Sequence, residues 1–452
     1  MRTHCPDGPG LSGWLTYDAC VPAPNRVSVS ASWYLSALAV GLVLARYAGY
    51  LWYEVPVVFG QAANILVTFA FFAVALLLWI PVRASSRARG GLALFLGLMA
   101  VAWVAHLVLY RYHGDSFNYT ALLYLPILVM VWWKPPSARE AWTAVSAFAW
   151  TASLVLVVTR VLEAVGSLDI KQQMQGVIAF DEERYFLPFN EALGIDGRWP
   201  GPFGHNGDTA MMGALLVVIA FAHWRRSSWV FLTVGVGTLL LTDGRASIGA
   251  MVAGLVVIAS LTTSGPFARI PRWVRITAGS VVLVAGAIFM ALRPAGVTGR
   301  DSIWPAFLDL WASSPWIGVG GIGIATEGGI AQQFGHGHSL YIDELARWGL
   351  VGFLTQFTAI AVGLIIAARA AGRGVPGPIA VMLAFLITGI TEPRNSWIEP
   401  SMTGFLLILM TLTASGILDR GSVDAGRASA GDLDSQRARG VVSTTGPDLG
   451  IR

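Results

Sequence analysis

Two histidines separated by one glycine, His336 and His338, stand before a long apolar segment of the chain. The sequence HSLYIDELARWG that follows reads as a helix, because Asp343 comes early, Arg347 comes late and Gly349 can end it. His338 is therefore expected at the N-terminus of this helix, where the helix dipole favours a neutral imidazole. A neutral imidazole can accept a proton from a hydroxyl, which is the chemistry of a general base.

Two arginines that each follow a glycine, Arg245 and Arg300, are candidates for binding phosphate. A glycine lets the backbone approach a ligand closely, and a planar guanidinium binds phosphate oxygens through two parallel hydrogen bonds. Both arginines fall in segments expected on the outer face of a membrane, against the usual preference of basic residues for the inner face. A pair of guanidinium groups on one face suits a diphosphate.

A metal site at His336 and His338 is the competing interpretation of the two histidines. The alternation His-Gly-His suits a strand better than a helix start, and no convincing third ligand lies nearby in the sequence. The pair Asp432 and Asp434, which resembles a metal-binding motif of nucleotide-sugar enzymes, falls in a tail expected in the cytoplasm. We therefore predict no metal. Three further histidines next to apolar segments are expected to be packed or interfacial residues: His106, His113 and His223.

The composition of the chain is that of a membrane protein. Only 12% of its 452 residues are charged, whereas an ordinary soluble domain has about a quarter. Its apolar residues form blocks of about twenty, the length that crosses about 30 Å of hydrocarbon. We predict an all-α integral membrane protein with about twelve transmembrane helices. The blocks are 32–52, 56–80, 91–110, 118–133, 141–162, 208–224, 229–242, 246–263, 274–292, 348–368, 375–391 and 399–417.

Basic residues between the blocks predict the orientation of the chain. They gather in alternate loops, which places both termini in the cytoplasm and two long loops outside. The net charge of +4 is thus explained by orientation, without nucleic acid as a partner. Short interfacial helices are expected in the outer loops, above all in the tryptophan-rich DSIWPAFLDLWASSPW. The predicted organisation is a cytoplasmic segment 1–31, helices within 32–162, an outer loop 163–207, helices within 208–292, an outer catalytic loop 293–347, helices within 348–418 and a disordered cytoplasmic tail 419–452.

Several stretches of the middle third of the chain, residues 197–352, resemble the O-antigen ligase and polymerase superfamily of bacterial membrane glycosyltransferases. They are GRWPGPFGHNGDTAMMGALL (197–216), LLLTDGRASIGAMVAGLVV (239–257), GRDSIWPAFLDLWASSPWIGVGGIG (299–323) and HSLYIDELARWGLVG (338–352). The spacing of Gly349 and Gly352 after the histidine is similar to the family pattern. Two departures are Ser339, where asparagine is common, and His205, which stands where proline is usual.

The resemblance implies an enzyme of the cytoplasmic membrane that takes part in surface polysaccharide biosynthesis. Its donor would be a glycan on a polyprenyl diphosphate, and its acceptor a hydroxyl of a glycan or glycolipid at the outer face, with no metal, nucleotide sugar or other cofactor. His338 would be the general base, and Arg245 and Arg300 would hold the diphosphate. Four further residues are accessory candidates: His336, Arg198, Arg394 and Tyr341.

Two other classes of protein fit part of the sequence. A transporter or flippase of lipid-linked sugars would also have about twelve spans, although it would favour charges or broken helices at mid-membrane and two similar halves. A glycosyltransferase of the peptidoglycan-polymerising kind would depend on an outer acidic residue, for which Asp301 and Asp309 are the candidates. The sequence does not separate a ligase from a polymerase, since both use the same reaction.

Overall fold

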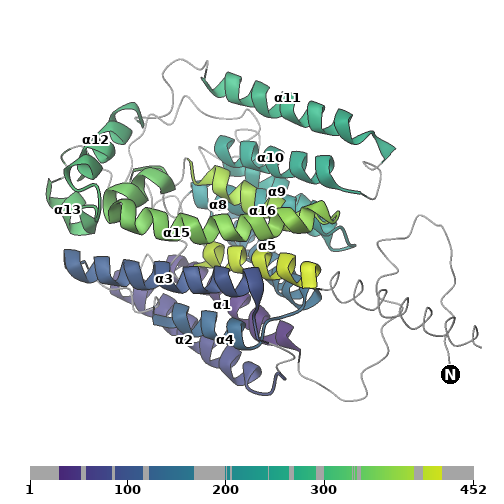
Figure 1. Cartoon of the computed structure of the whole chain (residues 1–452), viewed down its shortest axis with the longest axis horizontal. Coiled ribbons are helices and arrows are strands. Elements are labelled where there is room, and N and C mark those ends of the chain that lie inside the picture. Colours follow the sequence, from purple (N-terminus) through teal and green to yellow (C-terminus); the bar gives the residue numbers. More distant parts are fainter. Residues whose placement is uncertain are drawn as a thin grey trace, which may run out of the picture.

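The protein is a bundle of α-helices, and no strand occurs among the residues that its computed structural model describes (Figure 1). Those residues are 30–51, 57–83, 87–115, 122–166, 199, 201–203, 206–242, 244–263, 269–291, 300–327, 329, 331–332, 337–390 and 401–419. The helices are α1 (Ala31–Leu51), α2 (Val57–Trp79), α3 (Gly90–His113), α4 (Tyr124–Trp133), α5 (Ala138–Ala164), α8 (Asn206–Ala222), α9 (Ser228–Thr242), α10 (Arg245–Leu261), α11 (Arg272–Ala291), α12 (Arg300–Ser313), α13 (Gly320–Glu327), α15 (Leu340–Gly372), α16 (Gly377–Thr388) and a C-terminal helix, Met402–Asp419.

Each of the twelve predicted apolar blocks contains a helix, and the all-α class is confirmed for the described part of the chain. Six of these helices are long and apolar enough to cross a membrane: Ala31–Gly49, Ala62–Trp79, Gly90–His113, Ala138–Ala164, Leu340–Gly372 and Met402–Asp419. Five others are apolar but shorter: Tyr124–Trp133, Asn206–Ala222, Ser228–Thr242, Arg245–Leu261 and Gly377–Thr388. The chain is therefore a multi-pass membrane protein, and twelve crossings stay a prediction.

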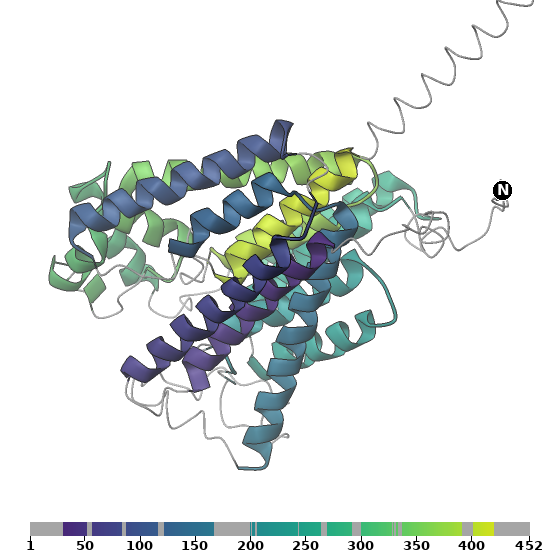
Figure 2. The same ribbon diagram turned by 90° about the horizontal axis from the view of Figure 1, so that it is seen from below.

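Two helices form the centre of the bundle. The C-terminal helix, yellow in Figure 1, packs against α15, where Thr411 lies against Gly363, and its side chains from Phe405 to Ala414 are all buried. In α8 nearly every residue is buried as well. A helix that is apolar on all sides has no solvent face and is surrounded by other helices. Around this centre, α1 packs against both α2 and α5, which lie beside it in Figure 2.

One end of the bundle gathers cations that bond to the C-termini of helices. Gly374 lies against Thr263, and Gly416 lies against Ala138, so the ends of α10, α15, the C-terminal helix and the start of α5 meet there. A cation favours the carbonyl end of a helix because the helix dipole is negative there. We call this the basic end. Three of its cations donate to carbonyls at the C-termini of α2, α10 and the C-terminal helix: Lys134, Arg275 and Arg373.

The opposite end of the bundle is held by a different set of contacts, and we call it the site end. A guanidinium nitrogen of Arg46 on α1 lies 3.2 Å from a carboxylate oxygen of Asp208 in the first turn of α8. The backbone N–H of Trp199 donates to the carbonyl of Leu241 near the end of α9, and its indole N–H donates to Glu163 on α5 at 2.6 Å. These contacts bring the start of α8 and the ends of α1, α5 and α9 together.

Candidate functional site

The backbone of His338 has an unusual conformation. Its φ is +48°, and it is the sole non-glycine residue with a positive φ in the described part of the chain. Side chains with a Cβ rarely adopt this region, and such conformations cluster at active sites, where surrounding contacts maintain them. His338 directly precedes Ser339, the N-cap residue of α15. The prediction that His338 lies at the N-terminus of this helix is confirmed.

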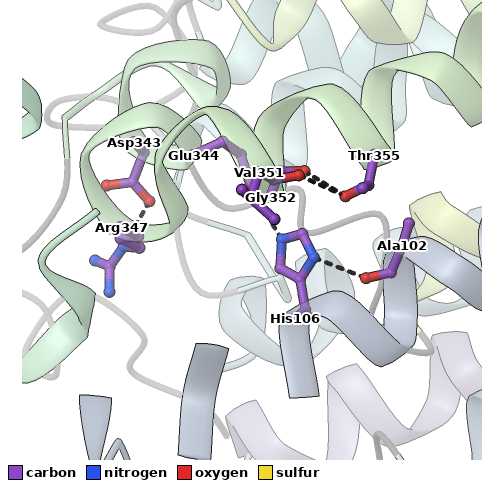
Figure 3. A network of polar contacts seen from close by, with 8 residues as sticks. All are labelled: Ala102, His106, Asp343, Glu344, Arg347, Val351, Gly352 and Thr355. Atoms are coloured by element: carbon purple, nitrogen blue, oxygen red, sulfur yellow. Dashed lines mark hydrogen bonds and ion pairs between the residues drawn. The ribbon is translucent and has the colours of Figure 1, made fainter. Parts of the chain in front are cut away.

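The carboxylate of Asp343 bridges the turn around His338 to the helix that follows. One of its oxygens accepts a hydrogen bond from the backbone N–H of Gly337 at 3.0 Å. The other accepts from Nε of Arg347 at 2.8 Å, a contact drawn in Figure 3. The turn that contains His338 is therefore tied to the second turn of its own helix by a buried carboxylate.

The start of α15 is also joined to the end of α16. The backbone N–H of Leu340 donates to the carbonyl of Gly389 at 2.8 Å. The hydroxyl of Tyr341 donates to the carbonyl of Leu386 at 2.7 Å, and its ring packs against Phe357. Tyr341 was an accessory candidate from the sequence, and the structure gives its hydroxyl a contact between two helices.

Arg245 is the first residue of α10, directly after Gly244, and lies at the site end. Gly244 lies against Ala210 in α8, whose first turn is bonded to Arg46. Because α10 runs parallel to α8 and antiparallel to α16, Arg245 and Gly389 lie at the same end of the bundle. The helix ends that carry Arg245 and His338 are thus on the same side of the protein.

Arg300 is the first residue of α12, and its side chain lies outside the described set. The tryptophan-rich stretch does form the predicted helix, which packs against the first turns of α15. Phe307 is fully buried and lies against Gly337, the residue before His338. The helix that begins at Arg300 therefore supports the turn that contains His338. Of the two acidic candidates in this helix, Asp309 is exposed and the side chain of Asp301 is outside the described set.

Three accessory candidates, His336, Arg198 and Arg394, lie outside the described residues. Within the described part, no three histidine, cysteine, aspartate or glutamate side chains are close enough together to hold a metal ion. The chemistry that the described groups offer is that of an imidazole and a guanidinium, which are suited to proton transfer and to binding an anion.

The connection between α3 and the start of α15 was not predicted from the sequence. His106 was expected to be a packed residue, and it is buried; its Nε2 lies 3.2 Å from a carboxylate oxygen of Glu344, which is also buried. Nδ1 of His106 contacts the carbonyl of Ala102 at 2.9 Å (Figure 3). The imidazole also packs against Trp348 in a T-shaped arrangement. A glutamate in an apolar segment was the signal in the sequence, but nothing there identified its partner.

Gly349 interrupts α15, as the sequence predicts, but the helix resumes after it. The residue has φ +60° and ψ −165°, so the first turns of α15 are set apart from the long apolar part. The N–H groups of Leu350 and Val351 donate to the carbonyls of Pro315 and Trp316, at 2.8 and 3.0 Å. The predicted span 348–368 is therefore part of a longer helix, Leu340–Gly372. Where Gly349 interrupts this helix, the segment after α12 supplies the carbonyls that accept its hydrogen bonds.

The other histidines expected to be packed residues each have a ring contact. Nε2 of His113 lies 3.0 Å from the carbonyl of Ile317, and the ring of His223 stacks on Trp142. Next to His113, the carboxylate of Asp115 accepts hydrogen bonds from the N–H groups of Gly321 and Ile322 in the first turn of α13. These contacts join the end of α3 to the helices that surround the turn at His338.

Residues 210–357 of the chain match the family model described as O-antigen ligase. The comparison with curated proteins found no match. The matched part runs from α8 into α15 and includes Arg245, Arg300 and His338. It overlaps most of the stretch for which the sequence analysis gave a resemblance to the O-antigen ligase superfamily, and that resemblance is confirmed.

Proposed function

We propose that this chain, which carries an O-antigen ligase family domain over residues 210–357, transfers a glycan from a polyprenyl diphosphate to an acceptor hydroxyl. The reaction takes place at the outer face of the cytoplasmic membrane, in the synthesis of a surface polysaccharide. The observation that carries the proposal is the family match, which spans the three residues singled out by their chemistry, within a bundle of apolar helices.

His338 is proposed as the general base. Its imidazole takes the proton of the acceptor hydroxyl while the hydroxyl oxygen attacks the anomeric carbon of the donor sugar. The bond from that carbon to the diphosphate oxygen breaks, and the diphosphate leaves with the electron pair. The maintained positive φ at His338 supports this role, because strained backbone conformations concentrate at functional sites.

Arg245 and Arg300 are proposed to hold the diphosphate and to stabilise the charge that develops on it as it leaves. The position of Arg245 at the site end of α10 and the packing of the Arg300 helix beside the His338 turn support a shared location. His336, Arg198 and Arg394 stay accessory candidates for the same anion. With arginines at the leaving group, the reaction is proposed to need no metal ion.

The proposal is tested with single substitutions in the native host. His338→Ala, Arg245→Ala and Arg300→Ala should insert normally and lose the surface polymer, and lipid-linked glycan should accumulate on the outer leaflet. Loss of a general base lowers a rate by about 100-fold or more. Matched controls at the basic end are His223→Ala and Arg226→Ala, which should retain the polymer.

Two outcomes would contradict the proposal. Accumulation on the inner leaflet would indicate a flippase of lipid-linked sugars, since the donor would then fail to reach the outer face. Full polymer production by His338→Ala would remove the proposed site. With purified protein and lipid-linked donor, transfer should continue in the presence of a strong chelator, and its loss on chelation with recovery on metal addition would contradict metal independence.

A further inference from the structure

We infer that Asp343 is a positioning residue, which maintains the backbone turn from which the His338 imidazole projects. The inference rests on the proposed function of His338 as the general base. It concerns a residue that the chemistry of glycan transfer would not itself require, because a carboxylate bonded to a backbone N–H and an arginine need not touch the substrate.

The turn at His338 needs an external acceptor. A residue with a Cβ rarely adopts a positive φ, and the side chain of the N-cap residue Ser339 makes no capping hydrogen bond. The backbone N–H of Gly337 instead donates a hydrogen bond to Asp343 Oδ1 at 3.0 Å. This bond closes the turn on both sides of His338, from the residue before it to the first turns of α15.

Arg347 holds the carboxylate of Asp343 in place for this contact. Its Nε lies 2.8 Å from Oδ2, while Oδ1 is left to accept from Gly337. The side chain of Asp343 is 11% exposed and that of Arg347 is 25% exposed, so the pair is largely sheltered from water. A charge-assisted hydrogen bond in such a setting is shorter and stronger than a neutral one, and it fixes the direction of the carboxylate.

The neighbouring carboxylate supplies a matched comparison. Glu344 follows Asp343 in the sequence and is buried to a similar degree, but its carboxylate faces His106 on α3 (Figure 3). Both residues anchor the first turns of α15. Of the two, Asp343 accepts a hydrogen bond from the turn that contains His338. Loss of Asp343 should therefore lower the rate that depends on the His338 imidazole, whereas loss of Glu344 should not.

The test uses purified full-length protein with a polyprenyl-diphosphate glycan as donor. Asp343→Ala should lower kcat by about 100-fold, because a displacement of about 1 Å in a catalytic group has that effect, and should leave the KM for the donor within about threefold. Asp343→Asn keeps an oxygen that can accept from Gly337 and should recover part of the rate. Glu344→Gln should change kcat by less than about threefold at matched amounts of folded protein.

A double substitution distinguishes positioning from a structural role. If Asp343 acts through His338, adding Asp343→Ala to His338→Ala should leave the residual rate of the single variant unchanged, since residues that act as a unit are not additive. A further drop in the residual rate, or full activity of Asp343→Ala, would overturn the inference. If the Asp343→Ala protein does not accumulate, Asp343→Asn replaces it, alone and combined with His338→Ala, and the same two rates are compared. Full activity of His338→Ala would instead count against the proposed function.

Discussion

Nε2 of His106 on α3 lies 3.2 Å from Oε2 of Glu344 on α15, and both side chains are buried. The pair joins the first turns of α15, directly after His338, to a helix more than two hundred positions earlier in the chain. The ring of Trp348 packs against the imidazole in a T-shaped arrangement. The first turns of α15 are therefore anchored to α3, which lies outside the matched family domain.

Removal of one partner of this pair should destabilise the protein. Glu344→Ala removes the partner of the buried Nε2 of His106, and His106→Ala removes the partner of the buried Glu344 carboxylate. Leaving a buried polar group without its hydrogen-bond partner costs about 1–3 kcal/mol. Thermal unfolding of the detergent-solubilised protein should show a lower Tm for both variants.

The double variant His106→Ala with Glu344→Ala is the control for this prediction. Because each single change already removes the shared contact, the loss in the double variant should be smaller than the sum of the two single losses. Strictly additive losses would show that the two side chains are not coupled, and would contradict the contact.

Gly349→Ala should prevent correct packing of α15 against the segment after α12. A Cβ at this position would lie 2.4 Å from the carbonyl carbon of Trp316 and 2.5 Å from the backbone nitrogen of Gly318. In addition, the backbone conformation of Gly349, with φ +60° and ψ −165°, is essentially restricted to glycine and costs another residue about 1–3 kcal/mol. The expected result is a lower amount of folded protein in the membrane and a lower Tm.

Gly372→Ala, near the other end of the same helix, is the matched control. A Cβ there would have no neighbour within 4 Å, and no positive φ is involved. Alanine in a helix is favoured over glycine by about 1 kcal/mol, so this variant should be as stable as the parent or slightly more so. Equal behaviour of the two variants would argue against the break at Gly349.

Asp115→Ala should loosen α13. The two carboxylate oxygens accept hydrogen bonds from the N–H groups of Gly321 and Ile322, each at 2.8 Å, and so cap the first turn of this short helix. Loss of a helix cap costs about 1 kcal/mol. Hydrogen–deuterium exchange should be faster in peptides that cover Gly320–Glu327, by about the fivefold that this energy corresponds to.

Asp115→Asn keeps one acceptor oxygen and should show a smaller increase in exchange. Peptides from α16, which Asp115 does not contact, provide an internal reference for the amount of folded protein. Unchanged exchange in α13 of Asp115→Ala would mean that another group caps the helix.

Much of the local structure could be predicted because it depends on neighbours in the sequence. The start of α15 beside His338 follows from the charges at Asp343 and Arg347, and its interruption follows from Gly349. The helix of the tryptophan-rich stretch was likewise expected. These features arise from contacts within a few residues of one another, so their signals lie in the sequence itself.

The pairing of helices could not be predicted in this way. Apolar helices in a membrane resemble one another in composition, because lipid and protein interior are equally apolar. Which helices pack together is determined by small residues and by polar side chains that form hydrogen bonds between helices. Nothing in the sequence indicated that His106 meets Glu344, that Asp115 caps α13 or that Tyr341 bonds to the end of α16.

The apolar helices, the imidazole at the start of one of them and two arginines that each follow a glycine could be recognised from the amino-acid sequence alone. Folding in three dimensions set the contacts around this helix start: Asp343 accepts from the N–H of Gly337, and the buried pair of Glu344 and His106 joins the helix to α3. Local hydrogen bonds and hydrophobicity specify a helix wherever it lies, whereas a contact between distant helices exists only when packing brings two particular faces together.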